Sequence, residues 1–269
     1  MKWLLAILPL NLAVAAENPL AVELISEAKS IEAGKTFTLG LHLTHPEGYH
    51  TYWKHPGAVG VATSVKWELP PGFVAGEIQW PAPEAVKMAR YTAQGYHDET
   101  LLMIPVTPPA NLKEAPVTLT AKVSWMCCGK QCNPASDVPF AITLPVTATT
   151  ERDSATRPVF EKYRHQVPQP DPAWSAAFDR RGKTFVLTLK PADPAVTRDV
   201  GELGELRFFT ADGQIDSDTP QTVTRGPGQV IRIELPVSEN EQTGDSPAGV
   251  VVATGGWRKS GGPQGLELR

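Results

Sequence analysis

Short runs in which apolar and polar residues alternate recur along this chain, and turns rich in proline or glycine separate them. The alternation is clear in "FTLGLHLTH" (Phe37 to His45), "VTLTAKVSW" (Val117 to Trp125) and "FAITLPV" (Phe140 to Val146). A period of two places every second side chain on the same face of a β-strand. The 269 residues include 26 Pro and 22 Gly and show few segments with a helical period, so the sequence predicts an all-β protein.

A second group of strand-like runs follows a change in composition. Residues 149–170 are polar and rich in proline, and they can hold at most the short helix "PVFEKYRHQ". Beyond them come the runs "TFVLTLK", "ELRFFT", "QVIRIELPV" and "GVVVAT". We therefore predict two β-sandwich domains, residues 17–148 and 171–269, which a linker of residues 149–170 connects.

The N-terminus has the features of a signal peptide. It reads "MKWLLAILPLNLAVAAENP", with Lys2 near the start, an apolar run from Trp3 to Leu10, and small residues that suit a cleavage site. We assign residues 1–16 to this signal. The apolar run falls well short of the ~20 residues that a membrane span needs. The chain is therefore predicted to be exported and not membrane-embedded, in a compartment where disulfides form.

The charge of the chain excludes one class of partner. The formal net charge is -4 and the isoelectric point is about 5.9, so no basic surface for DNA or RNA is expected. Nucleic acid is accordingly not among the predicted partners.

The three cysteines lie together in "WMCCGKQCNP", from Trp125 to Pro134. Cys128 and Cys132 flank three residues directly after an alternating strand, so a tight hairpin turn would bring them face to face. Facing residues of a hairpin have Cα atoms ~4.5 to 5.5 Å apart, which a disulfide accepts. Cys127 points to the opposite face of the strand, and we expect it to be a small buried apolar residue.

Three interpretations of these cysteines remain open at this point. A disulfide that closes a loop of ~5 residues removes only roughly 2 kcal/mol of unfolded-state entropy, which makes it a weak structural bridge. A redox role is favoured by the single cation Lys130 and the absence of carboxylates between Trp125 and Ser136. A soft metal site for Cu(I) or Zn(II) is the third, with the cysteines, Met126, His50 and His55 as candidate ligands, although the spacing fits no common metal motif.

Four motifs together resemble a known family. They read "GYHTYWKHPGAVGVATSVKWELPPGF", "IQWPAPE", "QGYHDETLL" and "WMCCGKQCNP". In order and spacing they are similar to the N-terminal periplasmic domain of DsbD-like thiol:disulfide interchange proteins, particularly the ScsB-like branch, over roughly Asn18 to Thr147. The second half is similar, by its strand pattern only, to the additional sandwich of ScsB-like proteins. The resemblance implies an all-β fold with two immunoglobulin-like β-sandwich domains in tandem.

The resemblance also assigns roles to residues. It implies that Cys128 and Cys132 are the redox pair, that Cys132 carries the attacking sulfur, and that an apolar residue is usual at Cys127. The family shields its pair with a loop that bears an aromatic residue. Here that loop would be residues 87–94, with Tyr91 as the first candidate for the cap and Met88 as the second.

The segment "GYHTYW" resembles a strand that runs beside the pair, so Tyr49, His50 and Tyr52 become candidate wall residues. For Trp53, Trp67 and Trp80 an ordinary place in the sandwich core is at least as good an interpretation.

The predicted function follows from these assignments. Such domains pass electrons from a membrane reductant to thioredoxin-fold partners in the periplasm, with no cofactor and no metal. The chain stops at Arg269 without the family's membrane and thioredoxin domains, so the electron donor is expected to be a separate membrane protein, unless the chain is an orphan module that acts differently or has lost the relay. If the present chain is redox-active, it would be a protein-disulfide reductase or a component of a disulfide interchange system. The alternatives are a non-catalytic periplasmic protein-binding module with a structural disulfide, and a copper-handling protein.

Overall fold

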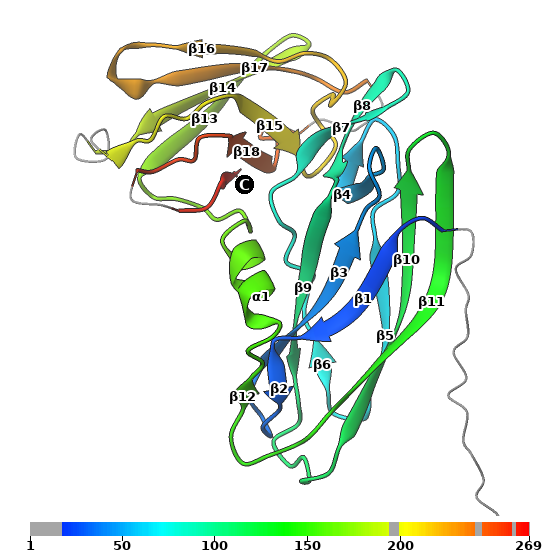
Figure 1. Cartoon of the computed structure of the whole chain (residues 1–269). Helices are drawn as coiled ribbons and strands as arrows, with labels where there is room; N and C mark the ends of the chain where they lie inside the picture. Colours follow the sequence, from blue (N-terminus) through cyan, green and yellow to red (C-terminus); the bar gives the residue numbers. More distant parts are fainter. Residues whose placement is uncertain (1–17, 194–198, 240–243, 260–261, 269) are drawn as a thin grey trace, which may run out of the picture.

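The computed structural model describes residues 18–193, 199–239, 244–259 and 262–268 (Figure 1). The expected signal peptide, residues 1–16, lies outside these ranges. Antiparallel sheets make up most of the described chain, so the all-β prediction is confirmed. Within the same ranges, no helix has the length and the apolar character that a membrane crossing requires.

The first half of the chain is a sandwich of antiparallel sheets. One sheet has the order β1-β3-β9-β6, a second β11-β10-β5, a third β4-β8-β7, and a short pair is formed by β12 and β2. The strands are β1 (Ala21–Ser26), β2 (Ala28–Ser30), β3 (Phe37–Thr44), β4 (Thr51–Gly57), β5 (Ser64–Glu68), β6 (Val74–Ala75), β7 (Glu84–Met88), β8 (Tyr91–Tyr96), β9 (Glu99–Thr107), β10 (Val117–Cys128), β11 (Cys132–Leu144) and β12 (Glu151–Arg152).

The core of this half lies between the sheets that contain β3, β9 and β10. Alternate residues of these strands fill it, as the period of two requires: Leu39, Leu41, Leu43, Leu102, Ile104, Val106, Leu119, Ala121 and Val123. Trp53 belongs to the same cluster, and Trp67 and Trp80 pack against it partly buried. Trp53 is thus a core residue, and Trp67 and Trp80 lie at the edge of the core.

Most of residues 149–170, the expected linker, packs against the first half, whereas Gln169 pairs with β19 (Gly265–Leu268) of the second half. Strand β12 pairs with β2. Helix α1 (Arg157–Arg164) begins at a proline-containing first turn and carries Lys162 and Arg164 in its last turn, where cations suit the helix dipole. Its buried residues Phe160 and Tyr163 contact Leu101 and Met103 of β9.

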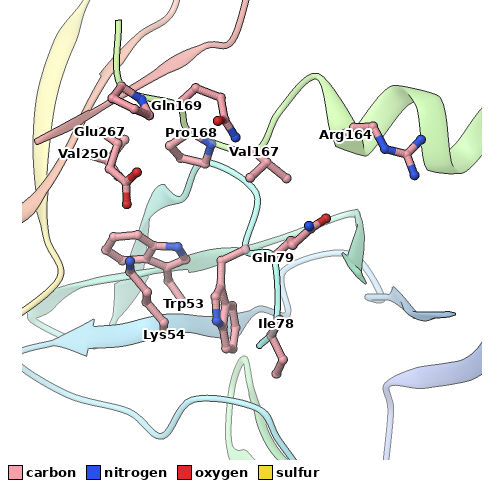
Figure 2. Close-up of a pocket in the computed structure, with 12 residues that line it drawn as sticks. Trp53, Lys54, Ile78, Gln79, Arg164, Val167, Pro168, Gln169, Val250 and Glu267 are labelled. Carbon is pink, nitrogen blue, oxygen red and sulfur yellow. The ribbon is translucent and has the colours of Figure 1, made fainter. Parts of the chain in front are cut away.

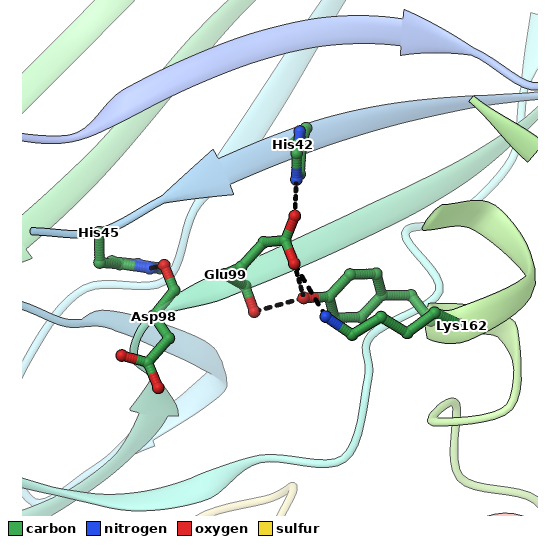
Figure 3. Close-up of polar contacts among 6 residues, drawn as sticks. His42, His45, Asp98, Glu99 and Lys162 are labelled. Carbon is green, nitrogen blue, oxygen red and sulfur yellow. Dashed lines mark hydrogen bonds and ion pairs between the residues drawn. The ribbon is translucent and has the colours of Figure 1, made fainter. Parts of the chain in front are cut away.

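Polar contacts around Glu99 complete the attachment of α1 (Figure 3). Lys162 Nζ lies 2.8 Å from Glu99 Oε2, and the Tyr163 hydroxyl donates to the Glu99 carbonyl at 2.6 Å. His42 Nε2 lies 2.6 Å from Glu99 Oε1. The hydrogen bond from Lys162 is the main cause that lowers the pKa of Glu99. The helix is therefore fixed to β9 by both apolar and charged contacts.

The second half has its own core between two antiparallel sheets, with the orders β13-β14-β17-β16 and β15-β18-β19. Its elements are β13 (Trp174–Arg181), β14 (Thr184–Pro191), β15 (Leu206–Thr210), β16 (Thr222–Arg225), the 3-10 turn η1 (Pro227–Gln229), β17 (Ile231–Pro236), β18 (Gly249–Ala253) and β19 (Gly265–Leu268).

The two halves meet beside strands β7 and β8 (Figure 1). Phe209 and Val250 come from the second half but belong to the hydrophobic cluster of the first. The side-chain amide of Gln94 on β8 pairs with the backbone of Thr210, donating to its carbonyl and accepting from its N–H, each at 2.8 Å. The exact domain boundaries at residues 148 and 171 stay a prediction.

Candidate functional site

The cysteine motif forms the end of a long hairpin. Strands β10 and β11 pair antiparallel, and the last pair in their register is Cys128 with Cys132. A disulfide joins these two residues, so the predicted pairing is confirmed. Their Cα atoms are 4.0 Å apart, closer than the ~4.5 to 5.5 Å expected, and the turn of residues 129–131 connects them directly.

Cys127 and Cys128 lie on opposite faces of β10, as neighbours on a strand do. Cys127 is free, fully buried and part of the main core. Cys128 is equally buried but belongs to a separate cluster around the disulfide. Burial raises the pKa of the Cys127 thiol to about 11, so at neutral pH it stays protonated and is a poor nucleophile.

A small apolar cluster surrounds the disulfide. It joins the two bonded cysteines to side chains from β4, the segment after β4, the β7–β8 hairpin and β10: Tyr52, Val59, Val86, Met88, Ala93 and Met126. Met88 Sδ lies 4.0 Å from Cys132 Sγ. The expected capping segment, residues 87–94, thus supplies two members of the cluster, Met88 and Ala93, and Val86 precedes it on β7.

This segment differs from the expectation in its secondary structure. Residues 87–94 were expected to form a loop, but they belong to strands β7 and β8, which pair from Glu84–Gly95 to Met88–Tyr91. Only Ala89 and Arg90 form the turn, and Ala89 adopts a positive φ of 53°. The strands read EAVKM and YTAQGY, in which apolar and polar residues do not alternate regularly, so the strand pattern is weak in the sequence.

Tyr91 stands at the beginning of β8 and faces Arg90. The Arg90 guanidinium lies 4.8 Å from the centre of the Tyr91 ring and donates to its hydroxyl at 2.5 Å. Tyr91 is half-buried and is not a member of the described cluster around the disulfide. Its role as a cap stays a prediction.

The three candidate wall residues all lie near the cysteine hairpin. The backbone of His50 pairs with that of Cys128 through two hydrogen bonds of 2.8 and 2.9 Å. The His50 ring meets the Tyr52 ring edge-on and lies 3.3 Å, Nε2 to Oη, from its hydroxyl. The Tyr49 ring lies over the turn, since a Cβ added to Gly129 would come within 2.9 Å of Tyr49 Cδ1.

Burial sets the protonation of this wall. It lowers the pKa of His50 and raises the pKa of Tyr52, with a smaller contribution from Cys127. Both side chains are therefore neutral around pH 7, where they provide a polar but uncharged surface beside Cys128.

The two bonded cysteines differ in burial. Cys128 is fully buried, whereas Cys132 is partly exposed at the end of the hairpin. Lys130 is exposed in the turn between them. Because access to sulfur limits thiol–disulfide exchange, a reagent from solvent meets Cys132 first.

In the described ranges, no group of three or more His, Cys, Asp or Glu side chains is placed to hold a metal ion. A cavity of about 630 Å³ lies between the halves (Figure 2), lined among others by Trp53, Lys54, Gln169 and Glu267. None of its lining residues belongs to the cluster around the disulfide.

Comparisons with known proteins agree with this geometry. Residues 16–143 match the family described as "Thiol:disulfide interchange protein DsbD, N-terminal". No curated protein matches the sequence significantly.

Among solved structures, the N-terminal periplasmic domain of ScsB from Proteus mirabilis aligns with a TM-score of 0.65 at 17% identity, over 96% of this chain and 95% of that one. This likeness shows the same fold across both halves. Domains 5–6 of the S-layer protein SbsC align over 92% of this chain and 95% of that one, with 9% identity and a TM-score of only 0.21, which supports no inference.

Proposed function

We propose, from the match of residues 16–143 to the family of the N-terminal domain of the thiol:disulfide interchange protein DsbD, that this chain exchanges dithiol for disulfide in the periplasm. Cys128 and Cys132 would be the redox pair. Electrons would pass from a separate membrane reductant through this pair to periplasmic partners with a thioredoxin fold.

The main support for the proposal is the position of the disulfide. One of its two cysteines is partly exposed to solvent, and a side chain lies against the sulfur of that cysteine. The loop that the disulfide closes is too short for a strong contribution to stability. Cys132 is partly exposed, and the Met88 side chain at the tip of the β7–β8 hairpin lies against its sulfur. A bond that serves exchange needs this combination, because it must be reachable for a partner and shielded from other reagents.

The exchange itself balances as follows. In the dithiol form, the Cys132 thiolate attacks one sulfur of a partner disulfide, which forms a mixed disulfide and releases the other partner sulfur as a thiolate. The Cys128 thiol then loses its proton and attacks Cys132 Sγ. The partner leaves as a dithiol, and Cys128 and Cys132 are oxidised to the disulfide, so two electrons have moved to the partner.

A redox titration tests the proposal. We expect the potential of the Cys128–Cys132 bond to lie between about -120 and -270 mV, the range of known exchange proteins. A potential below about -300 mV is typical of structural disulfides and would contradict the proposal in favour of a binding module with a structural bridge.

Trapping experiments test the roles of the two sulfurs. Cys128→Ala leaves Cys132 as attacker without its resolving partner, so this variant should accumulate mixed disulfides with a purified oxidised thioredoxin-fold protein. Cys132→Ala is the matched control, since it keeps only the buried Cys128 and should accumulate far less. Equal trapping by both variants would contradict the assignment of Cys132 as the attacking residue.

A further inference from the structure

Strand β8 has an unusual neighbour on one edge. On that side it pairs with β4 at Thr51 and Tyr52, and the register then shifts until Gly57. Beside Thr92, two residues from the second half of the chain occupy the edge. The Thr92 N–H donates to Asp218 Oδ1 at 2.7 Å, and the Thr92 carbonyl accepts from the Ser217 hydroxyl at 3.0 Å.

Ser217 makes a second contact that ties another segment to the same point. Its Oγ accepts a hydrogen bond from the N–H of Ala58, on the segment that follows β4, at 2.8 Å. Ser217 is only 4% exposed, so water does not compete freely for these bonds. One hydroxyl group therefore joins the β7–β8 hairpin to the segment after β4.

Both segments lead directly to the disulfide. Val59 follows Ala58, and Ala93 follows Thr92; both residues contact the cluster that contains Cys128 and Cys132. Met88, which lies over Cys132, is paired with Tyr91 one position before Thr92 in the register of the hairpin. A displacement of Thr92 or Ala58 thus moves the side chains that cover the sulfur atoms.

The second half holds Ser217 and Asp218 in place through bonds of its own. Arg207 Nη2 donates to the Ser217 carbonyl at 2.6 Å, and the Asp218 N–H donates to Asp216 Oδ1 at 2.9 Å. These contacts orient both residues toward β8 independently of the hairpin. A preorganised partner loses little conformational entropy when it forms such bonds.

We propose that Ser217 and Asp218 are positioning residues of the redox site, which hold its two covering segments closed and thereby set how fast a thiol reaches the Cys128–Cys132 bond. The inference rests on the proposed function, because the closed segments matter only if the disulfide takes part in exchange. The closure of the two segments over the disulfide can nevertheless be measured separately. It gives the second half of the chain a role in exchange at a site built entirely from the first half.

The rate at which dithiothreitol reduces the bond tests this role. We expect Asp218→Ala to raise the second-order rate constant roughly fivefold, the factor by which the loss of one typical hydrogen bond favours an opened state. Ser217→Ala removes two such bonds and should raise the rate constant more than Asp218→Ala does. Asp218→Asn keeps an oxygen that can accept from Thr92 and should restore the wild-type rate. Ser175→Ala removes a comparable bond from a hydroxyl to the Lys190 carbonyl, away from the hairpin, and serves as the control.

Amide hydrogen exchange locates the effect. Ser217→Ala should speed exchange at Ala58, and Asp218→Ala should speed exchange at Thr92, while amides of β3 and β9 keep their protection. If Ser217→Ala does not fold, the comparison of Asp218→Ala with Asp218→Asn still tests the inference.

Several outcomes would overturn the inference. Wild-type reduction rates in both alanine variants would do so, as would faster reduction without faster exchange at Ala58 or Thr92. An Asp218→Asn variant as fast as Asp218→Ala would show that charge, and not the hydrogen bond, is responsible. A potential below about -300 mV with faster reduction in the variants would contradict the proposed function while supporting the closure.

Discussion

Met88 Sδ and Cys132 Sγ lie 4.0 Å apart, although 44 positions separate the two residues in the sequence. The contact exists because the β7–β8 hairpin and the β10–β11 hairpin end at the same place. A side chain with three flexible bonds can cover a sulfur atom there and still move aside. Because one side chain makes this contact, a single substitution can change how well the disulfide is covered.

Removal of the Met88 side chain should expose the disulfide. We expect Met88→Ala to increase the rate of reduction by dithiothreitol more than Tyr91→Ala does, because Met88 contacts Cys132 and Tyr91 pairs with Arg90. Stopped-flow measurement of the reduction gives both rates. Met88→Leu keeps an apolar cover and is the control, and an equal rate in all three variants and the wild type would argue against a cap in this hairpin.

The third cysteine should be dispensable. Cys127 is free and buried in the main core, so Cys127→Val should fold, retain exchange and cost on the order of 1 kcal/mol or less. Chemical denaturation and the dithiothreitol assay measure the two properties. Cys127→Ser, which buries a hydroxyl, should be less stable than Cys127→Val. Loss of exchange in a folded Cys127→Val variant would instead give this thiol a chemical role.

The stability of the protein should fall in mild acid because of His45. Burial is the main cause that lowers its pKa from 6.5 to about 4, and its Nε2 lies 2.9 Å from Thr51 Oγ1. Between pH 6.5 and pH 4, His45 is protonated in the unfolded state but neutral in the folded state. The free energy of unfolding is therefore highest above pH 6.5 and decreases as the pH falls toward 4.

The loss attributable to this group is on the order of 3 kcal/mol. His45→Asn cannot take up this proton. The variant should be less stable at pH 7 but should lose less on acidification, as thermal unfolding between pH 7 and pH 4.5 would reveal. If the unfolding temperatures of the variant and the wild type fell equally with pH, His45 would not be the cause of the loss of stability in acid.

The attachment of helix α1 should depend more on apolar packing than on its ion pair. Phe160 is fully buried against β9, and Phe160→Ala should cost about 3–5 kcal/mol. Limited proteolysis should then cleave faster after Lys162 and Arg164. Glu99→Gln tests the polar side of the same contact and should cost only ~1 kcal/mol or less, since Lys162 and Glu99 are partly exposed. A larger loss of unfolding free energy for Glu99→Gln than for Phe160→Ala would contradict this prediction.

The sequence predicted the central strands and the cysteine pair well, because local patterns determine both. The runs at Phe37, Val117 and Thr184 correspond to β3, β10 and β14. The hairpin at Cys128 follows from strand alternation and a short turn. Strand β13 was missed because most of its residues are exposed and it lacks a clear apolar face.

The contacts that cover the disulfide could not be predicted in the same way. Ser217 and Thr92 are 125 positions apart, and nothing near Ser217 in the sequence distinguishes it from an ordinary loop serine. Such contacts depend on how the two halves of the chain pack, which a pattern in either half does not encode.

Phe209 and Val250 complete the hydrophobic cluster of the first half from strands of the second. A fragment that ends before residue 171 would therefore present an uncovered apolar patch to solvent, and a fragment that begins there would expose these two side chains. Exposed patches of this kind favour self-association. Each fragment should consequently be prone to aggregate at concentrations where the intact chain stays dispersed, which light scattering can compare directly.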